Sequence, residues 1–505
     1  MEHLRIGWAE ESLVPAKRVR LAGQFFERIS DHVESPISVT AMAVEACGDA
    51  LILASVDIVG VDRALLALIR KKFAELTGEV DPLKLVVSAT HTHTSLEVRA
   101  DADEEDRKNG IFQNSVSVLE EFLPAGKLYT PKVTADDTVL GAKEGAVFVA
   151  EKVALAAKRA WDNRAEAMYA NEFGRAPVGM CRRACYDDGS AKMWGDTNTA
   201  NFVALEGGND SGIELLYTFD REKKLTGVVA NLTCPAQILE QRSFISADFW
   251  GRTKALLREK LGQHIFLLGL CGAAGDQCPR DLVRWVDPET PIDDPNVKRP
   301  YLIKRKADPS MYDISGCNRA GKRIANEILS VYEEITDWQA EPVFVHKAIE
   351  LNLPLRKATE TEYREAVRQI EYYVEKNREK AQFDFEDNAR MHVYAGTILR
   401  YRQQQYTETF PIEYHVIRLG DIAITTNPFE LFLDYGNRIK ARSYAQQTFI
   451  VQLCCGCDGY LPTEKAEQGG HYSAYISSGN VGHEGGDLLV RNTIHEINTL
   501  FKEDV

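Results

Sequence analysis

The sequence predicts an α/β fold in which mixed β-sheets are flanked by helices. Apolar, β-branched runs of four to twelve residues alternate with stretches of helical periodicity from one end of the chain to the other. The composition is 44% hydrophobic and 27% charged, as in ordinary globular proteins. No internal repeat, low-complexity tract or Gly/Ser/Pro-rich linker divides the 505 residues. We therefore expect one large continuous domain over residues 1–505, although such a length often forms several domains.

Apolar runs bounded by turn residues predict the strands. They cover residues 37–46, 51–59, 83–89, 167–171, 202–205, 214–218, 227–232, 264–270, 342–353, 412–418, 422–426 and 448–453. The first two form a hairpin around Gly48 and Asp49, and Gly420 and Asp421 make a similar turn near the carboxyl end.

Stretches with helical periodicity predict the helices. They cover residues 62–76, 144–161, 249–261, 317–334, 360–377, 383–404, 429–442 and 488–501. The pair within 355–405 carries charged outer faces and indicates a helical insertion. Residues 281–313 are rich in Asp, Pro, Lys and Arg and have little periodicity. A loop of that length is either functional or mobile, and we favour a solvated insertion slightly over a substrate lid.

Charge and cysteine content narrow the classes of function. A net charge of −15 argues against a surface for nucleic acid or for anionic membranes. No apolar run approaches the ~20 residues that span a bilayer, and the first residues do not resemble a signal peptide. We interpret the ten cysteines as reduced thiols. These features predict a cytoplasmic protein with a small-molecule substrate, and they leave its oligomeric state open.

The strongest motif follows the strand at 83–89. It reads Leu85-Val-Val-Ser-Ala-Thr-His91-Thr-His93-Thr-Ser95. In an extended backbone, side chains at i and i+2 point to the same side, so both imidazoles would meet at one place. Histidine is a common metal ligand and proton carrier. The alternative is a hydrogen-bonded histidine pair at a strand end.

Further polar residues follow other strands. Asp276 and Cys278 lie on a small-residue turn, which is either a site or a packed glycine turn. Glu430 is expected in the first turn of a helix, where capping alone explains a carboxylate. The loop 457–473 holds Tyr460 and Tyr472, which either bind a ligand or simply pack.

Two more clusters have structural alternatives. Arg182 and Arg183 suit carboxylate or carbonyl binding, although surface salt bridges are the usual role. Cys454, Cys455 and Cys457 lack a second pair at zinc-finger spacing. We therefore expect buried thiols there.

The order of these motifs resembles the catalytic domain of the neutral/alkaline ceramidase family, which are zinc amidohydrolases, over roughly residues 1–490. The matching stretches are His91-Thr-His93-Thr, Cys181-Arg182-Arg183, Gly275-Asp276-Gln277-Cys278-Pro279, Pro428-Phe429-Glu430 and Tyr460-Leu-Pro-Thr-Glu464, followed by Tyr472. The resemblance implies that His91, Glu430 and Tyr460 bind one zinc ion. It implies an acid/base or substrate-orienting role for His93, and places Arg182 and Tyr472 at the scissile carbonyl.

The sequence departs from the family pattern at one ligand. A second zinc histidine should fall where this chain has Pro235, and no histidine is near. Cys234 or Gln237 could substitute, since a cysteine thiolate is a good zinc ligand. Otherwise three protein ligands remain, which is still usual for a catalytic zinc.

The resulting hypothesis is a metal-dependent hydrolase of an amide or ester, including a lactone, in a small polar substrate. A metal lowers the pKa of a bound water towards neutrality, and His93 would relay the proton. One alternative makes Cys278 a covalent nucleophile with His93 as its base. Another is a non-catalytic protein that binds or senses a small molecule. A third makes the His, Cys and Tyr residues purely structural.

Overall fold

The computed structural model describes residues 3–24, 26–101, 113–129, 136–283 and 313–502. Its larger sheet has the strand order β14-β13-β12-β7-β1-β3-β4-β5. The strands are β1 (Arg5–Ser12), β3 (Ser38–Ala46), β4 (Asp49–Val56), β5 (Leu85–Ala89), β7 (Ala165–Arg175), β12 (Gly212–Asp220), β13 (Leu225–Leu232) and β14 (Phe266–Cys271). Nearly all of the loop predicted at 281–313 lies outside the described residues.

The larger sheet bends sharply between β1 and β7. These two strands pair only through Arg5 with Glu166 and Ile6 with Ala165. Across the bend, the Trp8 ring of β1 stacks on Phe266 of β14 with centroids 5.7 Å apart. The two halves therefore face each other, and the carboxyl ends of β5, β13 and β14 come together.

Helices cover both halves of this sheet. Helices α1 (Arg63–Leu76) and α3 (Ala142–Asp162) share a hydrophobic core with the β1–β3–β4–β5 half. Helices α4 (Asp248–Leu261) and α5 (Asp313–Glu334) pack with β12 and β13 in a second core. Apolar residues recur on one face of each helix, so burial of that face stabilises the arrangement.

A smaller sheet has the order β16-β17-β18-β20. Its strands are β16 (Phe344–Pro354), β17 (Thr409–Leu419), β18 (Ile422–Thr426) and β20 (Gln447–Val451), and its helices are α8 (Leu433–Lys440) and α10 (His483–Leu500). Short elements complete the fold: β2 (Arg18–Val19), β6 (Val139–Leu140), β8 (Met180–Cys181), β9 (Arg183–Tyr186), β10 (Ala191–Met193), β11 (Phe202–Leu205), β15 (Gln277–Cys278), β19 (Glu430–Leu431), β21 (Tyr460–Leu461) and α9 (Glu464–Gly469).

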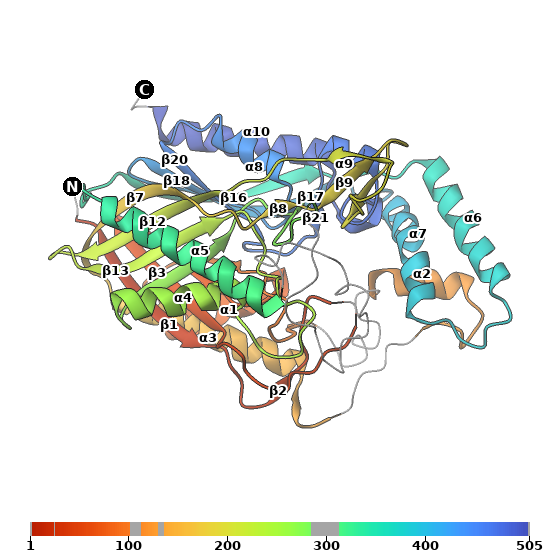
Figure 1. Cartoon of the computed structure of the whole chain (residues 1–505), viewed down its shortest axis with the longest axis horizontal. Coiled ribbons are helices and arrows are strands. Elements are labelled where there is room, and N and C mark those ends of the chain that lie inside the picture. The colour runs from red at the N-terminus through yellow and green to blue at the C-terminus, as the bar shows by residue number, and fades with distance from the viewer. Residues whose placement is uncertain (1–2, 25, 102–112, 130–135, 284–312, 503–505) are drawn as a thin grey trace.

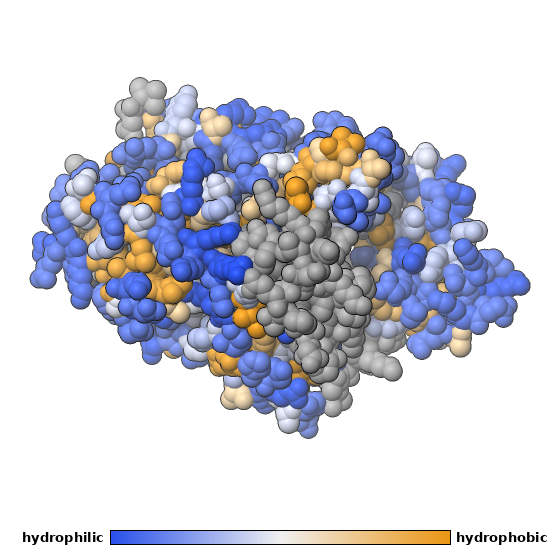
Figure 2. All heavy atoms as spheres, viewed as in Figure 1, coloured by the Kyte–Doolittle hydropathy of each residue, from blue (hydrophilic) through white to orange (hydrophobic). Residues whose placement is uncertain are grey.

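The connection from β16 to β17 contains α6 (Glu360–Lys376) and α7 (Phe385–Gln403). They pack with α2 (Gln113–Phe122), which the sequence analysis missed, around a small core of their own that includes Leu119, Ile370 and Ile398. These three helices lie to one side of the sheets (Figure 1), and their outer face is mainly hydrophilic in Figure 2.

The predicted combination of mixed sheets and flanking helices is confirmed, but several elements besides α2 were not predicted and one helix start is wrong. Strand β1 was not predicted, and the helix expected over 429–442 begins only at Leu433. Glu430 and Leu431 instead form β19, because they pair with Tyr460 and Leu461 in a distant loop. Among the described residues, none of the helices is long and apolar enough to span a bilayer.

Candidate functional site

The candidate site lies where β5, β13 and β14 end. The backbone N–H of Ala236, just after β13, donates to the Thr90 carbonyl, and the N–H of His93 donates to the Ala236 carbonyl, both at 3.4 Å. The segment after β13, in which the family's second histidine is missing, therefore still lies directly beside the two histidines of this chain.

His91 and His93 converge, but not through the alternation of an extended strand. Strand β5 ends at Ala89, and His91 has a φ of 63°. This left-handed conformation is strained for a residue with a side chain, and such strain is concentrated at functional sites. The two Nε2 atoms are 3.2 Å apart, and the Nδ1 atom of His91 lies 2.6 Å from the Val59 carbonyl oxygen.

Glu430 and Tyr460 are placed together by the short pairing of β19 with β21. They are direct partners in its register. The Glu430 Oε2 atom lies 3.7 Å from Nε2 of His91. Gly275 packs against this strand so closely that a Cβ atom there would be 2.3 Å from the Glu430 carbonyl oxygen. Only glycine permits that approach.

Arg182 and Tyr472 complete this group. Arg182 donates through Nη2 to the Gly275 carbonyl at 3.0 Å and to the Tyr460 hydroxyl at 3.4 Å. The same Nη2 atom lies 3.8 Å from Glu430. The Tyr460 and Tyr472 hydroxyls are 3.2 Å apart. The structure thus brings together His91, His93, Glu430, Tyr460, Arg182 and Tyr472 from separate parts of the chain.

Burial decides the protonation states in this site. It lowers the pKa of His91 to about 3, aided by the charge of His93 and opposed by the bond to Val59. His91 is therefore neutral, as a metal ligand must be. Burial raises the pKa of Tyr472 to about 12, so its hydroxyl keeps its proton and can donate a hydrogen bond. Burial also raises the pKa of Glu430.

Two nearby residues were missed by the sequence analysis. Glu240 Oε2 lies 3.2 Å from Nδ1 of His93. The Trp194 ring centroid is 5.7 Å from the Arg182 guanidinium and 4.9 Å from that of Arg280. Neither residue belongs to a recognisable motif, so only the tertiary structure could place them.

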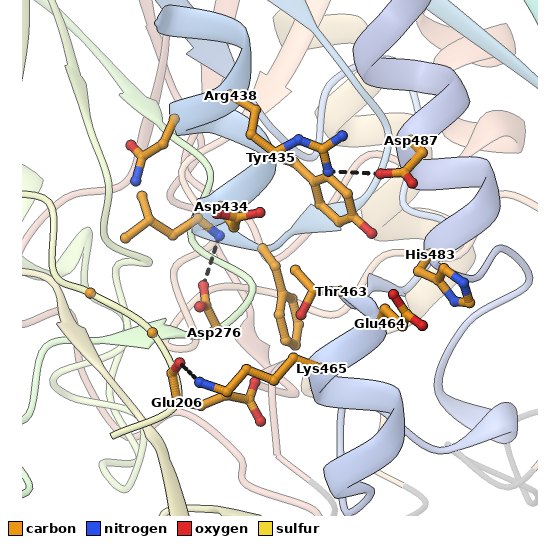
Figure 3. Close-up of a pocket in the computed structure, with 15 residues that line it drawn as sticks. Glu206, Asp276, Asp434, Tyr435, Arg438, Thr463, Glu464, Lys465, His483 and Asp487 are labelled. Carbon is orange, nitrogen blue, oxygen red and sulfur yellow. Dashed lines mark hydrogen bonds and ion pairs between the residues drawn. The ribbon is translucent and has the colours of Figure 1, made fainter. Parts of the chain in front are cut away.

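Asp276 lies at the edge of this site and points away from it. Its backbone carbonyl accepts from the Arg182 N–H at 2.9 Å, and its carboxylate accepts from the Leu433 N–H at 2.9 Å. The side chain lines a separate cavity of about 440 Å³ beside α8 (Figure 3). Asp276 therefore joins Arg182, which lies between β8 and β9, to the start of α8. Burial raises the pKa of Asp276 to about 6.

The cysteines proposed for chemistry are buried. Burial raises the pKa of Cys278 to about 12, and its thiol donates to the Arg280 carbonyl at 3.2 Å. Burial raises the pKa of Cys234 well above its ordinary value, and its thiol donates to the adjacent Pro235 carbonyl. Without a bound ion both thiols therefore stay protonated, which disfavours Cys278 as a nucleophile. Gln237, the other candidate ligand, is also buried.

A second cluster was not predicted from the sequence. The ligand atoms of Glu413, His415 and Cys455 lie within 4.8 Å of one another and could hold a metal ion. Among the described residues, the ligand atoms predicted around His91 do not all lie within 4.8 Å of one another. The Nη2 atom of Arg70 lies 2.6 Å from Glu413 and 3.8 Å from the Cys455 sulfur. The positive charge of this guanidinium is therefore already placed beside the cluster. Cys454 and Cys455 are buried as expected, but Cys457 is exposed.

A cavity of about 1090 Å³ adjoins the tyrosines of the first site. Tyr460 and Tyr472 form part of its wall, and α6 and α7 form much of the remainder. The lining mixes aromatic with charged side chains, including Tyr373, Tyr394, Tyr475, Arg356, Arg390 and Glu467. The predicted helical insertion thus shapes the space in front of the site.

Comparison with known proteins defines the class of fold. No protein-family model and no curated protein matches the sequence. Solved structures do match, and they show that the chain has a ceramidase-like α/β fold. Neutral ceramidase from Pseudomonas aeruginosa superposes with a TM-score of 0.65 at 13% identity, covering 99% of this chain and 75% of that chain. A structure described as ceramidase complexed with C2 gives 0.63 at 12% identity, covering 100% and 76%.

The residues present at His91 suit the zinc ion that the ceramidase resemblance implies. Imidazole, carboxylate and phenol oxygen are established transition-metal ligands. The Nε2 atoms of His91 and His93 lie 3.2 Å apart inside the protein, which is close to the spacing of two nitrogen ligands on one zinc ion.

Proposed function

We propose that this protein is a metal-dependent hydrolase that cleaves an amide, ester or lactone bond in a small polar substrate. The supporting observation is the convergence of a neutral His91, the Glu430 carboxylate, two tyrosine hydroxyls and the Arg182 guanidinium at one buried place. The ceramidase-like fold supports a hydrolase. The mixture of aromatic and charged side chains in the adjoining cavity supports a polar substrate.

The roles follow from chemistry and position. His91, Glu430 and Tyr460 would hold the metal, and a zinc ion can take a further ligand and a water beside them. A bound zinc ion supplies a water of lowered pKa and polarises the carbonyl. Arg182 and Tyr472 are the donors for the negative charge that develops on the carbonyl oxygen. Arg182 keeps its charge because, although burial opposes it, Tyr460 and Glu430 raise its pKa.

The first test is metal content and hydrolysis by the wild-type protein. Protein purified without chelator and reconstituted with zinc is analysed by inductively coupled plasma mass spectrometry. It is then screened against chromogenic amides, esters and lactones. We expect bound zinc and a hydrolytic activity that a chelator removes and zinc restores. Absence of zinc after reconstitution, or an activity that resists the chelator, contradicts the proposal.

Replacing Cys278 with serine tests the covalent alternative. We expect kcat to change by less than about threefold, because the buried thiol is protonated and bonded to the Arg280 carbonyl. The measurement is kcat on the best substrate from the screen, with mass spectrometry for an acyl-enzyme in both proteins. A complete loss of kcat together with a trapped wild-type thioester would establish Cys278 as the nucleophile instead.

A further inference from the structure

Contacts with neighbouring segments fix the orientation of the His93 ring. It rests on Gly23, which has a φ of 91°, and a Cβ atom there would be 2.5 Å from the His93 Cγ atom. The buried Arg28 donates to the His93 carbonyl at 2.6 Å. The backbone N–H of His93 donates to Ala236. Backbone contacts on two sides and a glycine cradle therefore hold this ring against His91.

Hydrogen-bond chemistry assigns the protons on both rings. The Nδ1 atom of His91 faces the Val59 carbonyl, which can only accept, so this nitrogen carries the hydrogen. The Nδ1 atom of His93 lies 3.2 Å from the Glu240 carboxylate, at ion-pair distance but outside hydrogen-bond geometry. A neutral imidazole carries one hydrogen, so an imidazole that binds a metal through Nε2 keeps that hydrogen on Nδ1. The two Nε2 atoms face each other across 3.2 Å, a spacing that one shared cation, a proton or a metal ion, would bridge.

The distance and the outer contacts match a metal centre. Two nitrogen ligands on a tetrahedral zinc ion are about 3.3 Å apart, given zinc–nitrogen bonds of about 2.0 to 2.1 Å. A metal-bound histidine commonly donates its other N–H to a backbone carbonyl or a carboxylate. Val59 and Glu240 supply one of each.

We propose that His93 is the second imidazole ligand of the metal and that Glu240 is the carboxylate that orients it. His93 thus replaces the histidine that the family pattern places at Pro235, and it gives up the acid/base role that the resemblance implies. Glu240 lies in the same segment after β13 as Pro235. The inference rests on the proposed metal-dependent function, but it concerns which residues bind the ion.

Zinc K-edge X-ray absorption on the zinc-loaded wild-type protein tests this assignment directly. We expect two imidazoles per zinc and no sulfur shell at about 2.3 Å, the zinc–sulfur distance that Cys455 would give. The affinity for zinc alone is then measured with a competing chelator dye. We expect His93→Gln to weaken it at least about a hundredfold and Glu240→Gln about 10- to 100-fold, as for other residues that orient a ligand.

Matched controls separate this inference from the proposed function. His264→Gln changes an exposed histidine and should leave the affinity unchanged. Circular dichroism checks that each variant folds. If His93→Gln does not fold, the X-ray absorption spectrum of the zinc-loaded wild-type protein still tests the assignment. One imidazole per zinc, with unchanged affinity in Glu240→Gln, overturns the assignment of His93 and leaves a metal-dependent hydrolase. Zinc with a sulfur ligand likewise overturns the assignment of His93, whereas no zinc at all overturns both.

Discussion

Replacing His91 or Glu430 with alanine is expected to abolish zinc binding at the first site and to reduce kcat/KM by on the order of a thousandfold or more. Each change removes a ligand, and without the metal the attacking water returns to a pKa far above neutrality. Their side chains lie 3.7 Å apart, so both losses act at one centre. Zinc per chain and kcat/KM on the best substrate measure the effect.

Both variants should still fold. A single substitution typically lowers the free energy of unfolding by about 0.5 to 3 kcal/mol, which a domain of ordinary stability tolerates. His264→Ala and Glu375→Ala, which change exposed residues of the same types, serve as matched controls. Full zinc content in both His91→Ala and Glu430→Ala would exclude these residues as ligands. The Glu413–His415–Cys455 cluster would then be the remaining candidate for the ion.

Replacing Arg183 with methionine is expected to lower the free energy of unfolding by about 3 to 5 kcal/mol. The Arg183 guanidinium is fully buried and donates to both carboxylate oxygens of Glu206, at 2.7 and 2.9 Å. It also donates to the carbonyls of Tyr472 and Gly470. Its loss leaves a buried, uncompensated carboxylate and releases the loop that carries Tyr472. Urea unfolding measures the loss.

A second substitution checks the stated cause. Adding Glu206→Gln to Arg183→Met removes the uncompensated charge and should recover part of the lost stability. Arg378→Met is the control, because Arg378 pairs with Glu375 on the surface with both side chains largely exposed. Such pairs contribute about 0 to 1 kcal/mol. A loss below about 1 kcal/mol in Arg183→Met would mean that this ion pair does not hold the tyrosine loop.

Strong local patterns made most of the fold predictable. The apolar run at 83–89 and the charged, periodic segment at 360–377 correspond to β5 and α6 within a few residues. The prediction failed where pairing over long range outweighs local preference. Glu430 has the pattern of a first helical turn, yet it forms a strand because Tyr460, 30 positions away, supplies the partner.

The site was predictable in part for the same reason. His91, Glu430, Tyr460, Arg182 and Tyr472 each follow a motif, and the structure places them together. Asp276 and Cys278 belong to a motif as well, but their side chains turn towards α8 and the Arg280 carbonyl. Glu240 follows no sequence pattern, and Glu413 and His415 share an i, i+2 spacing on β17 whose partners Cys455 and Arg70 are distant in the chain.

The sequence by itself determined the class of fold, the order of the motifs and the absence of a histidine at Pro235, because these depend on local periodicity and residue type. Only the tertiary structure decided what lies around the two histidines. The turn at His91 and the packing of Gly23 aim both Nε2 atoms at one point, and the segment after β13 brings Glu240 to His93. Directions and distances between side chains arise from packing over long range, which no local pattern encodes.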